Sequence, residues 1–214
     1  MRRLLLVFAL AAAIGPSDRP AWSIEPGSAI YLVSEYGPVE ARVTHTQDLD
    51  RYSLYVIETD EGPLCGLANS VPAAAVPLEG RWNARSEWSP GGLTLACVNG
   101  AIGKCVIWGY RPWEPGMRRF HQTCIRAVRA DYCGDGAGQT VDGTPIDIWD
   151  SKGITERAGV PGMRLEAEWG PYGATLIWTT RFPFGMDYVR RNCPDRFYPG
   201  NAEISLIANS SYPN

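Results

Sequence analysis

The chain has 214 residues and a formal net charge of −3, with basic and acidic residues scattered along it. This pattern argues against a nucleic-acid partner, because nucleic-acid-binding proteins gather basic residues on one surface. The length suffices for one large or two small domains with a hydrophobic core. Eight tryptophans, 23 glycines and 17 prolines favour a β-rich, turn-rich fold.

The N-terminus has the pattern of a secretory signal peptide. Residues 1–3 form a short basic segment, and residues 4–14 form an apolar run that is too short to span a bilayer. Cleavage after Ala13 or after Ser23 fits the small-x-small rule, and we favour Ser23 because the apolar run then stays clear of the cleavage site. We therefore expect a signal peptide over residues 1–23, no later membrane span, and a mature protein in the periplasm or the extracellular space.

Three strands are expected at the start of the mature chain. Residues 29–34, 39–45 and 52–59 alternate apolar and polar side chains and are separated by turn residues, which predicts a β-meander. The Ala/Pro/Gly-rich passage at residues 71–83 is either a domain boundary or a crossover. We expect a single domain over residues 24–214, the alternative being a small β subdomain at 24–80 and a main part at 81–214.

The second half predicts more hairpins and one helix. A hairpin is expected from residues 93–98 and 104–110, and further strands at 146–149, 163–169, 174–181 and 204–208. Residues 117–133 form an amphipathic helix, which begins after a Pro-Gly pair and ends at Gly134, with an arginine-rich polar face. The expected fold is α+β and mostly β, with antiparallel hairpins and meanders, this main helix packed on a sheet, and disulfide staples.

Four polar residues in and after this helix form the candidate functional site: His121, Asp131, Asp135 and Asp142. Asp131 in the last helical turn would oppose the helix dipole, which predicts a specific partner. The favoured interpretation is structural, with Asp131 buried against an arginine or backbone donors. Along a helix, His121 and Asp131 lie about 15 Å apart, so they do not form a direct catalytic pair.

The glycine-rich acidic loop after the helix is a weak candidate for Ca²⁺, with Asp131, Asp135 and Asp142 as ligands. The EF-hand order of acidic residues is absent, so ordinary Asp-Gly turns are the favoured interpretation. No other cofactor and no catalytic residue is predicted.

Six cysteines in an exported chain indicate three disulfides: Cys65, Cys97, Cys105, Cys124, Cys133 and Cys193. If the helix runs to residue 132, Cys124 and Cys133 are about 13 Å apart, too far for a bond between them. We favour Cys65–Cys193, with Cys97 and Cys105 paired to Cys124 and Cys133. A direct Cys97–Cys105 hairpin bridge is the rival. Because the cysteines are paired, Cys124 beside His121 is not expected to be a nucleophile.

Several motifs resemble the ADYC domain family of exported bacterial proteins. They are P-L-C-G at residues 63–66, W-G-Y-R-P-W at 108–113, A-D-Y-C at 130–133 and D-G-T at 142–144. In order, such elements cover roughly residues 50–200. The resemblance implies family membership and export, and it assigns no activity. Gln139 stands where the family often has His, which argues against an Asp/His metal site.

Three functions follow from these patterns. The first is an exported, disulfide-stabilised binding or interaction module for an envelope protein, a peptide or a glycan. Its candidate contact residues are Trp108, Tyr110, Trp113 and Trp149. The second is a Ca²⁺-dependent protein or a hydrolase-like enzyme with its site at residues 131–150. The third is a structural envelope protein.

Overall fold

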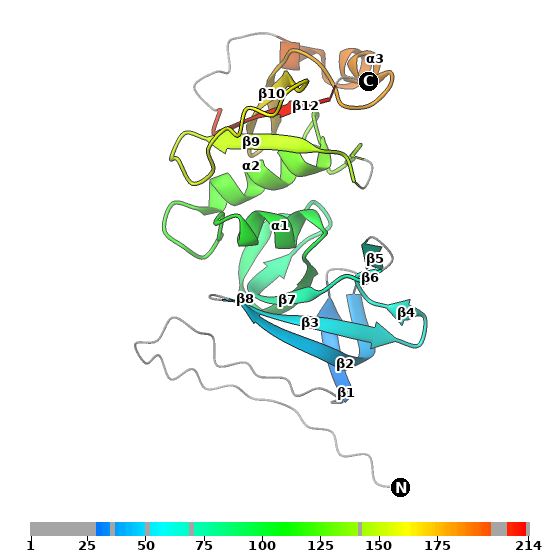
Figure 1. The fold of residues 1–214 in the computed structure, drawn as a ribbon. Coiled ribbons are helices and arrows are strands. Elements are labelled where there is room, and N and C mark those ends of the chain that lie inside the picture. The colour runs from blue at the N-terminus through cyan, green and yellow to red at the C-terminus, as the bar shows by residue number, and fades with distance from the viewer. Residues whose placement is uncertain are drawn as a thin grey trace, which may run out of the picture.

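The structure, a computed structural model, contains two larger β-sheets with helices α1 and α2 between them (Figure 1). It describes residues 29–34, 37–49, 52–68, 71–140, 143–197 and 205–212. The expected signal peptide at residues 1–23 and the candidate site residue Asp142 lie outside the described residues. The mostly β, α+β fold class is confirmed.

The first sheet has six strands in the order β2-β1-β8-β7-β3-β4, and an additional pairing of β2 with β3 closes five of them into a ring. A short pair, β5 (Leu67–Ala68) and β6 (Val71–Pro72), lies beside it. The six strands are β1 (Ala29–Ser34), β2 (Gly37–Leu49), β3 (Tyr52–Thr59), β4 (Gly62–Pro63), β7 (Ala75–Trp82) and β8 (Trp88–Cys97).

The second sheet is antiparallel, in the order β11-β10-β12-β9, and α2 packs on it. Its strands are β9 (Ile146–Asp150), β10 (Arg164–Gly170), β11 (Gly173–Ile177) and β12 (Ile207–Ser211). The helices are α1 (Ala101–Ile107), α2 (Arg118–Arg129) and α3 (Gly185–Asn192), followed by the 3₁₀ turn η1 (Pro194–Phe197).

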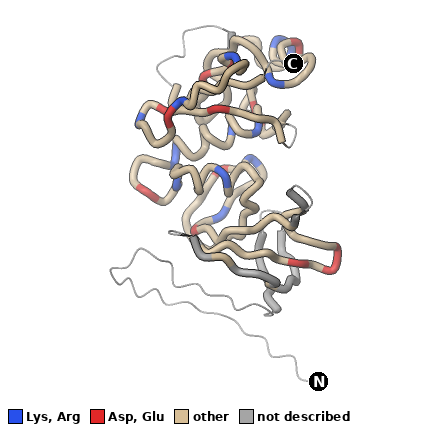
Figure 2. The backbone as a smooth tube through the Cα atoms, viewed as in Figure 1, with Lys and Arg blue, Asp and Glu red and all other residues tan. Residues whose placement is uncertain are grey.

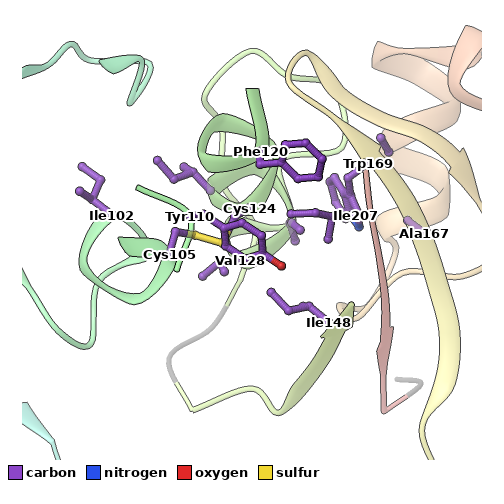
Figure 3. Packing of buried hydrophobic residues seen from close by; sticks show 14 of the residues in the cluster. Ile102, Cys105, Tyr110, Phe120, Cys124, Val128, Ile148, Ala167, Trp169 and Ile207 are labelled. Atoms are coloured by element: carbon purple, nitrogen blue, oxygen red, sulfur yellow. A yellow bond between two sulfur atoms is a disulfide. The ribbon is translucent and has the colours of Figure 1, made fainter. Parts of the chain in front are cut away.

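The β7–β8 hairpin contributes to two hydrophobic cores. Successive side chains of a strand point to opposite faces, so Ala75 and Leu95 bury among the strands of the first sheet while Val76 and Ala96 face the helices. The hairpin therefore joins the closed strand ring to the helical layer. In the larger core, the Cys105–Cys124 bond lies between α1 and α2, and Trp169 and Ile207 approach from the second sheet (Figure 3).

The predicted hairpin strand at residues 104–110 was wrong. Residues 101–107 form α1 instead of a hairpin strand, because Ile102, Cys105 and Val106 bury one helical face and Gly103 packs against the Cys97 carbonyl. A Cβ at Gly103 would lie 2.3 Å from that oxygen, so this glycine permits close packing and does not mark a turn.

The passage at residues 71–83 contains a regular strand, because β7 pairs with β8 over most of its length. The alternative domain boundary at residues 80–81 falls inside β7. Gly80 lies at a bulge in this strand, where the Trp88 side chain occupies the space of a Cβ. The single-domain assignment stays a prediction.

The disulfide pairing differs from the favoured one. The bonds are Cys65–Cys97, Cys105–Cys124 and Cys133–Cys193, and none of the six cysteines is free. Cys105 does bond to Cys124, but the expected Cys65–Cys193 bond and the rival Cys97–Cys105 bridge are wrong. The reason is α1, which separates Cys97 from Cys105 and turns Cys105 toward α2.

The disulfides indicate a protein of an oxidising compartment outside the cytoplasm. Within the described residues, no helix is long and apolar enough to cross a membrane. Basic and acidic residues are interspersed along the described chain and form no single stripe (Figure 2).

Candidate functional site

His121 is a fully buried residue of α2 whose two ring nitrogens both have partners. Its Nε2 accepts a hydrogen bond from Trp82 Nε1 (2.9 Å), so its Nδ1 carries the proton and donates to the Tyr110 carbonyl (2.7 Å). Burial lowers the pKa of His121 to about 4, because a charged ring would lose its hydration. The neutral ring thus ties α2 to β7 and to the segment after α1.

Asp131 is fully buried and lies just beyond α2. It forms an ion pair with Arg126, and its two oxygens accept backbone N–H groups of Gly134 (2.9 Å) and Gly136 (3.0 Å). Both kinds of partner expected for a structural role are therefore present. The carboxylate fixes the first turn of the following loop.

The end of α2 differs from the prediction. The helix ends at Arg129, and Ala130 adopts the left-handed conformation (φ 53°, ψ 41°) that was expected of Gly134. Asp131 therefore lies outside the helix and does not oppose its dipole. Arg126 was placed on the solvated face, but it is buried because it neutralises Asp131 and also donates to the Pro171 carbonyl (3.4 Å).

A second buried polar network centres on Glu166 of β10. Glu166 Oε1 accepts the Tyr132 hydroxyl (2.6 Å), and Oε2 accepts the Asn209 amide (2.9 Å). Arg181 forms an ion pair with Glu166 (2.8 Å) and donates to the carbonyls of Ala127 (2.7 Å) and Val128 at the end of α2. Burial and the charge of Glu166 raise the pKa of Tyr132.

Sequence reasoning missed this network because Glu166 alternates with apolar neighbours and was assigned to the wet face of its strand. The register shifts between Leu165 and Ala167 where β10 pairs with β12, so Glu166 lies at an irregularity and turns inward. A charged residue at a bulge cannot be recognised from a period of two. The network is fully paired and buried, which supports a structural role.

Each residue of the tetrapeptide at 130–133 has a different structural role. Ala130 ends α2, Asp131 holds the next loop, Tyr132 reaches Glu166, and Cys133 bonds to Cys193 after α3. The segment therefore connects α2, the following loop, β10 and the end of α3.

The three predicted site residues that the structure describes do not form one cluster. Asp131 and Asp135 share one loop, where Asp135 is exposed and accepts the Ala137 N–H (2.8 Å). His121 has its own partners near β7, and the structure does not describe Asp142. Among the described residues, no three His, Cys, Asp or Glu side chains gather as metal ligands. Calcium binding stays a prediction.

Asp147 and Asp150 of β9 hold the segment after that strand. Asp147 accepts the N–H groups of Ala158 (3.2 Å) and Gly159 (3.1 Å), and Asp150 accepts those of Lys152 (2.7 Å) and Thr155 (2.8 Å). Burial alone would raise the pKa of Asp150, but these N–H groups and the Tyr110 hydroxyl outweigh it, so the pKa is lowered. Both carboxylates act as turn anchors.

The predicted aromatic contact residues are largely used for packing. Tyr110 is fully buried and donates its hydroxyl to Asp150 (2.8 Å), while Trp108 and Trp113 are half-buried against the larger core. Trp149 is half-buried, and its ring lies under the Arg157 guanidinium, 4.8 Å from ring centroid to Cζ.

Among the described residues, the three most exposed aromatic side chains lie on and around β11 and α3. Phe184 is 81% exposed and Tyr172 is 72% exposed, while Trp178 is 44% exposed. Phe184 precedes α3 and has a left-handed backbone (φ 63°, ψ 9°), which is a genuine outlier for a bulky residue. Sequence analysis missed them because neither α3 nor the end of β11 at Ile177 was predicted.

The comparisons with known proteins agree with the motifs. The family model of the ADYC domain matches residues 22–183, which is most of the chain. The chain belongs to the ADYC domain family. Neither the search of curated proteins nor that of solved structures finds a match.

Proposed function

We propose that this protein is an exported binding module that holds a partner polypeptide through an aromatic surface at α3. This α3 surface consists of Phe184 and Tyr188, the adjoining Asp135, and Tyr172 on the β10–β11 turn. The observation that carries the proposal is Phe184, an exposed aromatic residue with a strained backbone.

The conformation of Phe184 is unfavourable on two counts. A left-handed backbone costs a non-glycine residue about 1 kcal/mol or more, and an exposed phenyl ring gains little from burial. Strained residues of this kind cluster at sites of function. An aromatic residue in this position supports a role in contacting another molecule.

The segment that carries Phe184 is firmly anchored. Arg181 is buried in the Glu166 network, and the Phe182 ring packs 5.9 Å from the Tyr132 ring, centroid to centroid. The Thr180 hydroxyl donates to the Phe182 carbonyl (3.4 Å), and Gly185 packs so closely on Thr180 that a Cβ there would clash. A rigid support reduces the entropy lost when a partner binds.

A polypeptide partner fits this surface better than a glycan. Phe184 protrudes and has no polar group to bond a sugar hydroxyl, whereas an apolar pocket of a protein can enclose it. The buried groups His121, Asp131 and Glu166 already have partners within the chain, which supports binding over catalysis.

Export rests on the sequence of residues 1–23 and on the three disulfides. The family match begins at residue 22, next to the expected cleavage after Ser23, which supports a mature domain that starts there.

Site-specific photo-crosslinking in the envelope of producing cells tests the proposal. A photoreactive phenylalanine at position 184 should give a discrete adduct of higher mass, and digestion of that adduct should release peptides of a second protein. The same group at Tyr212, an exposed aromatic residue just after β12, is the matched control and should give none. No adduct at 184, or equal adducts at both positions, would contradict the proposal. An adduct whose added mass is removed by glycosidases, and which yields no peptides of a second protein, would identify a glycan instead.

A further inference from the structure

We infer that the α3 surface recognises a basic side chain of its partner, with the Asp135 carboxylate as counter-charge and the rings of Phe184 and Tyr188 around the aliphatic stem. This inference rests on the proposed binding function and names the chemistry of the partner.

Phe184 and Tyr188 lie one turn apart at the start of α3. The Tyr188 N–H donates to the Phe184 carbonyl (3.0 Å), which holds the backbones of the two residues together. Phe184 is exposed and Tyr188 is half-buried, so both rings have surface that a partner can contact.

Asp135 adjoins Tyr188. The Cys133–Cys193 disulfide holds the loop that carries Asp135 at the end of α3. Burial and the negative charges of Asp135 and Asp131 raise the pKa of Tyr188, so the Asp135 carboxylate lies near the Tyr188 hydroxyl. Because Asp135 also accepts the Ala137 N–H, its carboxylate is held in place at the surface. A fixed carboxylate beside aromatic rings is the arrangement that binds ammonium and guanidinium groups.

Among the residues that the structure describes, Asp135 takes part in no ion pair. The four ion pairs that connect described residues are Arg111–Glu114, Arg126–Asp131, Arg181–Glu166 and Arg190–Asp187. Asp131 is compensated by Arg126, and the exposed Asp187 of α3 by Arg190. Asp135 therefore offers a charge that no described ion pair compensates, which gives the surface its preference for a cation.

The turn that carries Tyr172 borders the same site. A Cβ on Gly134 would lie 1.8 Å from the Tyr172 carbonyl, so this turn rests directly on the residue before Asp135. Tyr172, whose side chain is exposed, therefore belongs to a turn that packs against the loop of Asp135. Glycine at 134 is required, because its backbone has a positive φ (75°) and no side chain fits under the turn.

The test is an NMR titration of the full-length mature protein with three capped pentapeptides that differ only at two positions, which hold lysine, norleucine or glutamate. Norleucine keeps the apolar stem of lysine without its charge. The lysine peptide should shift the amide signals around residues 135 and 184–188 and bind about tenfold more tightly than the norleucine peptide. Added salt should weaken the difference.

Two variants separate the effect of the Asp135 charge from the effect of other acidic groups on the α3 surface. Asp135→Asn should lower affinity for the lysine peptide about tenfold, whereas Asp187→Asn, a matched exposed acid on α3, should change it less than about twofold. Equal binding of the lysine and norleucine peptides, or an unaffected Asp135→Asn variant, would overturn the inference while the crosslink at position 184 decides the binding function separately. Shifts of the same amides by a chitooligosaccharide in place of the lysine peptide would also overturn it.

Discussion

At the scale of single residues, the polar groups of α2 show how burial and charge are balanced. Burial lowers the pKa of His121 and keeps its ring neutral, whereas Asp131 forms an ion pair with Arg126. Each is tolerated in the core because its hydrogen-bonding groups are satisfied.

The neutral His121 predicts a specific dependence of stability on pH. Its pKa in the folded state, about 4, lies below the ordinary value of 6.5, so the unfolded chain binds the proton more readily. Its contribution is fully present above pH 6.5 and is lost as the pH falls toward 4, by about 3 kcal/mol in all.

Urea denaturation of the protein and of His121→Gln between pH 7 and pH 4 measures this loss. Glutamine can both donate and accept a hydrogen bond but does not titrate. The difference in free energy of unfolding between the two proteins should therefore shrink as the pH falls. A difference that stays constant would refute the neutral, buried histidine.

The Arg126–Asp131 pair predicts a strong coupling. Asp131→Asn leaves a buried guanidinium without its counter-charge and should lower the free energy of unfolding by about 3–5 kcal/mol. The double variant Arg126→Met/Asp131→Asn should regain part of this loss, because methionine fills the space without a charge. Losses that simply add in the double variant, measured by denaturation, would show that the pair is not coupled.

At the scale of elements, alternation and helical periodicity predicted what local sequence determines. The strand at residues 52–59 and the strands near β9 and β10 are confirmed, as is the packing of α2 on a sheet. Helix α1 was predicted as part of a hairpin, because this helix is short and contains Gly103. This glycine packs against β8 and does not mark a turn. Contacts between distant segments are not encoded in local periodicity.

Only part of the candidate site could be predicted from the sequence, again because contacts between distant segments do not appear in local periodicity. The structural role of Asp131 followed from its position in an apolar face, but its partner Arg126 was placed in solvent. Glu166 and Phe184 depend on a bulge and on a left-handed turn, which arise from tertiary packing. The uneven spacing of the cysteines likewise could not settle their pairing.

The hydrogen bonds of the acidic loop after α2 lead to a testable prediction about calcium binding. The carboxylate oxygens of Asp131 already accept hydrogen bonds from Arg126 and from backbone N–H groups, so Asp131 is a poor ligand for Ca²⁺. We expect the same thermal midpoint with saturating Ca²⁺ and with EDTA. A midpoint raised by Ca²⁺ and restored by Asp135→Asn or Asp142→Asn would instead establish a calcium site in this loop.

At the scale of the whole molecule, the chain is a disulfide-stabilised α+β module whose buried polar residues mostly serve the fold. The tetrapeptide that resembles the family signature joins α2, the second sheet and α3, and Cys133–Cys193 holds α3 in place. The rigidity created there supports the strained Phe184 at the surface. On this account, the buried core directly supports the proposed binding surface.

Two phenylalanines separated by one residue allow the most direct test. Phe182 packs on Tyr132, so Phe182→Ala should lower the free energy of unfolding by about 2 kcal/mol or more. Phe184→Gly removes an exposed ring and relieves the left-handed backbone, so stability should be unchanged or rise by up to about 1 kcal/mol.

The measurement is denaturation of Phe184→Gly combined with the lysine-peptide titration on the same preparation. The account predicts that Phe184→Gly retains or gains stability and loses peptide binding. A clear loss of stability would show that Phe184 supports the fold, and unchanged binding by a stable Phe184→Gly variant would show that the α3 surface is not the binding site.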